Sequence, residues 1–184
     1  MRWEALFDDF EAQLVEAQRA ELEAEVRELA WAEQSELALA ERLRGDDGAV
    51  IDVALCGGLR FRGEVRQVAD TWFCLEAGPR SVLIPLHAVV AIGGLGRRSR
   101  REVSAVRRGL SLASALRALA RARVQVVCHL GRGSGAPITV SGTIDGVGRD
   151  YAELAPGRAE AWETRALGTT LAALSALVAV VSPA

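Results

Sequence analysis

The sequence predicts an α+β protein in which a long N-terminal helix precedes two five-stranded small β-barrels, joined by an arginine-rich linker and a short helix. Three observations carry this prediction. The first 44 residues have the spacing and composition of a helix, apolar residues then alternate with polar ones, and the alternating region returns later in the chain. The corresponding segments are 1–47, 48–96, 97–123 and 124–184.

The N-terminal segment has neither Gly nor Pro between Trp3 and Arg44, and Ala, Glu, Leu, Gln and Arg dominate it. These residues lose little on entering a helix. Trp3, Phe7, Phe10 and Leu14 recur at helical spacing and form an apolar stripe. A helix of about 40 residues is about 60 Å long, more than either small barrel can cover. We therefore predict that part of this stripe contacts another chain, either a second copy or a protein partner, or the second half of this chain.

The first alternating region begins with Ile51, Val53 and Leu55, and Gly57-Gly58 turns the chain. Four further short strands are predicted, at 59–65, 72–75, 82–84 and 88–92. Five strands within about 45 residues have to curl to bury one face, which is typical of a small barrel.

The second copy is found by sliding the sequence along itself. A shift of 79 places Gly63, Val65, Val68, Trp72 and Leu75 on Gly142, Ile144, Val147, Tyr151 and Leu154, and a shift of 88 places 86–90 on 174–178. A helix capped by Ser111 is predicted before this copy, whose first strand holds Val124, Val126 and Cys128. The apolar stretch 167–181 falls short of the roughly 20 residues that span a bilayer, so we expect a buried strand and no membrane partner.

The repeated unit resembles the Sm-like small barrel of the Sm, LSm and Hfq proteins, over about 100 of the 184 residues. The residues that carry the resemblance are Val53, Leu55, Gly58, Phe61, Gly63, Val65, Val68 and Leu75, then Leu86, His87, Ala88, Val89 and Ile92. Such barrels pair through their fourth and fifth strands, which implies self-association along residues 83–92, with Leu83 and Ile84, and along residues 171–181 in the second copy. The chain reads Pro85-Leu86-His87 where Hfq reads Tyr-Lys-His, which implies a nucleic-acid contact for His87.

The acidic, Trp-led beginning is also similar to actinobacterial proteins that carry a label of Fis-type transcriptional regulator. A Fis-type protein needs a basic helix-turn-helix near its C-terminus. This C-terminus is apolar and has the pattern of strands, so the sequence does not favour that label.

Charge is distributed in two opposite blocks, although 22 basic and 24 acidic residues nearly cancel. Residues 1–48 hold 14 acids against 5 arginines, a balance of −9, and residues 97–123 hold 9 arginines against one acid, a balance of +8. The arginines are candidates for phosphate contacts with RNA or DNA, or they form a linker whose charge is compensated by the acidic helix. Compensation explains both blocks together. The candidates are Arg97, Arg98, Arg100, Arg101, Arg107 and Arg108.

Other chemistry is poorly represented. The chain has no Lys, which excludes a Walker-type phosphate loop, a Schiff-base lysine and a lysine base, and no catalytic motif is recognisable. His87 and His129 do not occupy equivalent positions, so no metal site is expected. Trp72 and Tyr151 occupy equivalent positions of the repeat. Their rings are candidates for stacking on bases, but we favour the interpretation that each closes a barrel.

We therefore expect a non-enzymatic, homo-oligomeric binding and assembly module without cofactors. The alternative is an RNA- or DNA-binding regulatory protein that uses the basic block 97–123. Three widely spaced cysteines, Cys56, Cys74 and Cys128, are typical of reduced core residues and predict a cytoplasmic protein.

Overall fold

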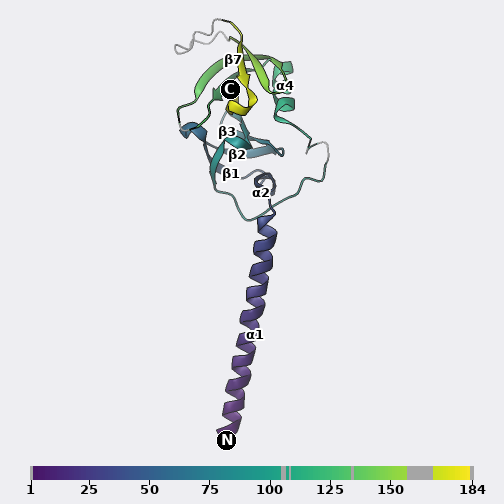
Figure 1. Ribbon diagram of the computed structural model, residues 1–184, viewed down its shortest axis with the longest axis vertical. Coiled ribbons are helices and arrows are strands. Elements are labelled where there is room, and N and C mark those ends of the chain that lie inside the picture. Colours follow the sequence, from purple (N-terminus) through teal and green to yellow (C-terminus); the bar gives the residue numbers. More distant parts are fainter. Residues whose placement is uncertain (1, 105–106, 108, 134, 157–167, 183–184) are drawn as a thin grey trace. The chain divides into compact units, whose positions relative to one another are not determined.

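The computed structural model describes residues 2–104, 107, 109–133, 135–156 and 168–182; the side chains of residues 2–14, 17 and 33 lie outside that description (Figure 1). The chain divides into two units, Met1–Ala38 and Leu39–Ala184, which we describe separately.

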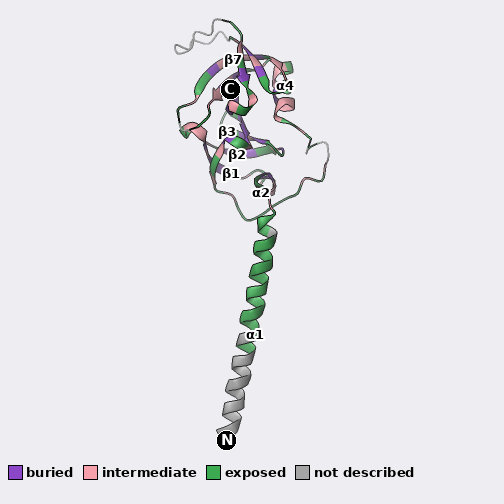
Figure 2. Cartoon of the chain, in the orientation of Figure 1, coloured by how far each residue is buried: buried purple, intermediate pink, exposed green. Residues whose placement is uncertain are grey.

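The first unit is built around helix α1 (Arg2–Ser35), which ends short of the predicted Arg44. The Ser35 hydroxyl donates to the Ala32 carbonyl at 2.8 Å, a bond by which Ser competes with helix continuation. Residues 36–38 leave the helix, and a separate helix α2 (Leu39–Gly45) follows in the second unit. The described apolar side chains of α1, among them Leu22, Val26 and Leu29, are exposed (Figure 2).

The second unit contains ten strands in one antiparallel sheet, in the order β5-β1-β2-β3-β4-β10-β6-β7-β8-β9. The strands are β1 (Val50–Leu55), β2 (Arg60–Val68), β3 (Trp72–Ala77), β4 (Arg80–Pro85), β5 (Val89–Gly93), β6 (Gln125–Leu130), β7 (Ile138–Val147), β8 (Tyr151–Pro156), β9 (Thr170–Ala173) and β10 (Leu177–Ser182). Short 3-10 turns are η1 (Cys56–Gly58), η2 (Leu86–Ala88) and η3 (Leu174–Ala176), and helix α4 spans Leu112–Ala122.

The predicted fold class, with two closed five-stranded barrels, is therefore wrong. The protein is mostly antiparallel β, and its two five-stranded halves join into one open sheet. The junction forms because β4, the fourth strand of the first half, pairs with β10, the fifth strand of the second, at Leu83 with Val180 and at Val82 with Val181. Each strand thereby satisfies the main-chain groups that an edge would leave unpaired. We call this pairing of β4 with β10 the central junction.

Two apolar clusters lie along the sheet and meet at the central junction. Val82, Ile84, Ala179 and Val181 belong to the cluster of the first half, whereas Leu83 and Val180 belong to that of the second. Both faces of β4 and β10 are consequently buried, and neither strand shows the alternating burial of a one-sided sheet. This arrangement explains the apolar run near the C-terminus as a buried strand.

The internal repeat is confirmed by irregularities of the sheet. Pairing of β2 with β3 shifts between Val65 and Gln67, and pairing of β7 with β8 shifts between Ile144 and Gly146, which are 79 residues further on. Pairing of β1 with β5 passes over Val90, and pairing of β6 with β10 passes over Val178, 88 residues further on. Bulges redirect a strand, so their conservation between the halves gives both the same bend.

Helices cover the sheet at two places. Leu43 of α2 is fully buried in the first cluster, and Leu116 of α4 in the second. The Ser111 side chain accepts from the Ser114 N–H and caps α4, as predicted. Within the described residues, the helices all fall short of the length and apolar character needed to cross a bilayer.

Candidate functional site: an arginine-lined pocket and two sheet edges

The first part of the basic segment lies against α2 and the turn that follows it. The Arg100 N–H donates to the Glu41 carbonyl at 2.9 Å, and the Gly96 N–H donates to the Asp46 carboxylate. A side chain at Gly45 would collide with the main chain of Arg98. Contacts of the main chain at Gly96 and Arg100 therefore hold this stretch against α2 and the turn after it, independently of the side chains of Arg97, Arg98 and Arg100.

Two of the predicted arginines pair with acids of the block 1–48. Arg100 reaches Asp47 at 3.3 Å and Arg101 reaches Glu41 at 3.5 Å. Exposed pairs of this kind contribute about 0–1 kcal/mol, so they orient the segment more than they stabilise it. The contacts follow the predicted charge compensation, with partners in α2 and the turn after it.

The remaining predicted arginines differ in position. Arg97, Arg98 and Arg107 are exposed, and their side chains make no hydrogen bond or ion pair within the described part of the chain. Arg108 lies outside the described residues. Among the predicted arginines that the structure describes, the side chains of Arg97, Arg98 and Arg107 are thus available for a ligand.

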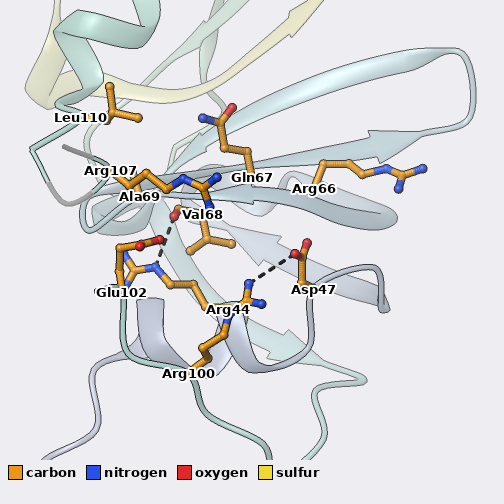
Figure 3. A pocket seen from close by; sticks show the side chains of 10 residues that line it. All are labelled: Arg44, Asp47, Arg66, Gln67, Val68, Ala69, Arg100, Glu102, Arg107 and Leu110. Atoms are coloured by element: carbon orange, nitrogen blue, oxygen red, sulfur yellow. Dashed lines mark hydrogen bonds and ion pairs between the residues drawn. The ribbon is translucent and has the colours of Figure 1, made fainter. Parts of the chain in front are cut away.

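A pocket of about 520 Å³ opens between the end of α2, the end of β2 and described residues of the basic segment between Arg100 and Leu110 (Figure 3). The pocket brings together the arginines 44, 66, 100 and 107 with Asp47, Gln67 and Glu102, and its apolar lining comes from Val68, Ala69 and Leu110. Neither Arg44 nor Arg66 was a candidate from the sequence, because both lie outside the basic block 97–123 and have acidic residues close to them along the chain.

Arg44 is the most buried charged side chain of the pocket, at 5 % exposure. Its Nε donates to the Val68 carbonyl at 3.3 Å, and its terminal guanidinium pairs with Asp70. Burial of a guanidinium without such partners is costly. Arg66, by contrast, is exposed and is paired with Glu76 at 2.8 Å and with Glu64 at 3.1 Å.

His87 occupies a different place, since its Nε2 lies 3.0 Å from the Leu177 carbonyl at the start of β10. This hydrogen bond joins the two halves beside the central junction. One ring nitrogen of His87 is therefore engaged with the main chain of the second half, while the residue itself is exposed.

The residues predicted to mediate self-association are not at a free surface of the sheet. Leu83 and Ile84 are buried on β4, and β10 already occupies the edge at which they were expected. The side chains of Trp3, Phe7, Phe10 and Leu14 lie outside the described residues.

Among the described strands, β5 and β9 stand at the two ends of the sheet, and they fall in the predicted edge segments 83–92 and 171–181. Each exposes one large apolar side chain, Val90 at 66 % and Leu171 at 65 %. The shift of 88 residues places β5 on β10 and β4 on β9, so each end strand has its repeat counterpart in the central junction. The sequence contains this correspondence, but the strand order is needed to tell which of these strands stand at an edge.

Trp72 is buried, and its Nε1 donates to the Leu110 carbonyl at 3.0 Å, so it closes the second cluster and has no free face for a base. Tyr151, its counterpart in the repeat, is exposed.

The cysteines are free thiols. Burial raises the pKa of Cys74 to about 11 and that of Cys128 to about 12, so both stay protonated and unreactive at neutral pH. Among the residues that the structure describes, no three His, Cys, Asp or Glu side chains gather as metal ligands do.

The chain matches no family model and no curated protein.

Proposed function

We propose that the protein is a non-enzymatic assembly module whose copies join through the edge strands β5 and β9. One observation supports this proposal above all: the outer edges carry, at equivalent positions, the same kinds of side chain that the central junction buries.

The central junction supplies the template. Leu83 is 6 % exposed there, opposite Val180, and Val178 is 2 % exposed. In the repeat, Leu171 on β9 corresponds to Leu83, and Val90 on β5 corresponds to Val178. A Leu and a Val that are buried inside the chain thus have counterparts that are exposed on its two edges.

The surface beside β5 is hollowed in agreement with this comparison. A pocket of about 370 Å³ is lined by residues of β1, β2 and β5, among them Ala91 and Gly93. Their counterparts on β10 are Ala179 and Val181, which are packed in the apolar cluster of the first half. A second copy seated at β5 fills the place that the first half fills at β10.

The expected pairing is antiparallel, with β9 of one copy beside β5 of the next. Transfer of the register of the central junction puts Leu171 opposite Ile92 and Thr170 opposite Gly93. Because the two edges differ, the contact is head-to-tail, and it generates a closed ring or an open filament. Either assembly covers strand edges that would otherwise invite aggregation.

Sedimentation velocity of the full chain between 1 and 100 µM, a range of about 100-fold, tests the proposal in the regime of ordinary specific association. We expect species larger than the monomer, and we expect Leu171→Glu or Val90→Glu to return them to monomer. Val103→Glu is the matched control, because Val103 is 90 % exposed and lies outside the strands. A wild-type chain that is monomeric throughout this range would refute the proposal.

Helix α1 is a second surface in this proposal, for a protein partner. Val15, Leu22, Val26 and Leu29 expose apolar side chains along it. We also propose a cytoplasmic location, which the three free cysteines support.

Nucleic-acid binding remains the second candidate, favoured by the exposed and unpaired side chains of Arg97 and Arg98 in the described segment. Arg100 and Arg101 pair with Asp47 and Glu41, which favours compensation of the basic block by acidic residues of the same chain. Filter binding of RNA and DNA at two salt concentrations separates the two readings. Only phosphate contacts make the salt dependence weaker when Arg97 and Arg98 are replaced by Gln.

A further inference from the structure

The arginine-lined pocket is separate from the sheet edges and has no part in the assembly proposed above. We propose that it binds a small ligand through a single phosphate group. Its lining comes from the end of α2 and the residue Asp47 after it, from the end of β2, and from Arg100, Glu102, Arg107 and Leu110 (Figure 3).

Arg44 provides a fixed donor in this pocket. Its bonds to the Val68 carbonyl and to Asp70 hold the guanidinium in one orientation, and 95 % of the residue is removed from solvent. A guanidinium has five N–H donors, and these two bonds leave others for a ligand. A donor that is already oriented loses little conformational freedom when an anion binds.

Arg107 provides the free charge. Its main-chain N–H donates to the Ser104 hydroxyl at 3.4 Å, while its side chain has no hydrogen-bond or ion-pair partner among the described residues. The side chain nevertheless lines the pocket. Arginine binds phosphate oxygens with two parallel N–H bonds, so Arg44 and Arg107 together suit one phosphate group.

The carboxylates of the pocket limit the size of the anion. Asp47 is paired with Arg100, and Glu102 accepts the Ser104 N–H at 2.9 Å. These two negative groups lie within the same lining as the four arginines. A chain of phosphates would have to pass them, whereas one compact phosphate group is stabilised by the arginines without that repulsion.

Isothermal titration of the full chain tests the proposal, at constant ionic strength in a buffer without phosphate. The probes are inorganic phosphate and adenosine 5′-monophosphate, which distinguish a free ion from a phosphorylated small molecule. We expect saturable binding of at least one probe. Arg107→Gln should weaken it by about tenfold to hundredfold, the range for loss of a charged hydrogen-bond partner.

Arg80→Gln is the matched control, since Arg80 is exposed and lies outside the pocket, and it should bind as the wild type does. Far-ultraviolet circular dichroism checks that both variants are folded. Absence of binding to both probes overturns the proposal, as does equal binding by the Arg107→Gln and wild-type chains. A single-stranded RNA that binds equally well to the wild type and to Arg107→Gln, and displaces the small probes, also overturns it.

Discussion

Replacement of Leu83 and of Leu171 by Ala makes the same chemical change at two equivalent positions of the repeat, one inside the central junction and one at the β9 edge. Leu83 is 6 % exposed, and its truncation leaves a cavity in the second cluster. A buried Leu→Ala change costs about 2–5 kcal/mol of unfolding free energy. Leu171 is 65 % exposed, so in the monomer its truncation should change stability by less than about 0.5 kcal/mol.

The same numbers predict the effect on association. If the outer edge is buried as the central junction is, the exposure of Leu171 falls from 65 % to 6 %, a change of 65 − 6 = 59 percentage points. Full burial of a Leu side chain is worth about 1.5–3 kcal/mol, so this fraction is worth about 1–2 kcal/mol. An Ala side chain keeps part of this burial free energy. Leu171→Ala should therefore lose about 1 kcal/mol per contact, which lowers the association constant about fivefold.

Urea unfolding followed by circular dichroism measures the first effect, and sedimentation velocity measures the second. Leu83→Ala should lower the unfolding midpoint strongly, and Leu171→Ala should lower only the association constant. Val103→Ala, at an exposed site outside the strands, should change neither. The proposal that the β9 edge is buried in an assembly as β4 is in the central junction would be refuted by either of two results. One is that Leu171→Ala destabilises the dilute monomer as much as Leu83→Ala does, and the other is that it leaves the association constant unchanged.

Three further predictions concern register, packing and pH. A chain with Ile92→Cys and Leu171→Cys should form intermolecular disulfides on mild oxidation, visible as a ladder on non-reducing gels, and a shifted pair of Ile92→Cys with Ala173→Cys should form markedly fewer. Gly63→Ala should lower the unfolding free energy by about 1–3 kcal/mol in urea titrations, because the new Cβ would collide with the Glu76 carbonyl of the neighbouring strand; an unchanged midpoint would contradict this contact. Burial lowers the pKa of His129 in the folded chain, so the unfolded chain binds more protons at pH values between the folded and unfolded pKa. The unfolding free energy should therefore be full above about pH 6.5 and decline as the pH falls toward the folded pKa. His129→Gln should make the unfolding free energy, measured from pH 7 to 5, less dependent on pH.

The pocket shows why part of the candidate site was not predictable. Arg100 and Arg107 belong to a conspicuous basic block, whereas Arg44 stands at the end of a helix and Arg66 on a strand with acids nearby. They meet only because α2 packs Leu43 into the first cluster and the segment 96–100 returns to α2. The distribution of charge along the chain identifies Arg100 and Arg107 as candidates, but it does not indicate that Arg44 and Arg66 belong to the same pocket.

Local pattern was sufficient for the strands and for the repeat, since alternation of apolar residues and the shifts of 79 and 88 depend on the chain's own order. The bulges at Val65 and Ile144 follow the same repeat. The alternation within each half equally suits a strand in a closed barrel and a strand in a larger sheet, because both bury one face.

The sequence by itself determined that two related five-stranded halves exist, that helices begin the chain and precede the second half, and that charge is divided between two blocks. Only the tertiary structure decided how the halves join. Pairing of β4 with β10 depends on main-chain hydrogen bonds between strands far apart in the chain, and main-chain groups are the same in every sequence. That choice buried Leu83 and left Val90 and Leu171 exposed. Of the predicted edge segments 83–92 and 171–181, β4 and β10 pair with each other within the chain, and β5 and β9 stand at the two ends of the sheet.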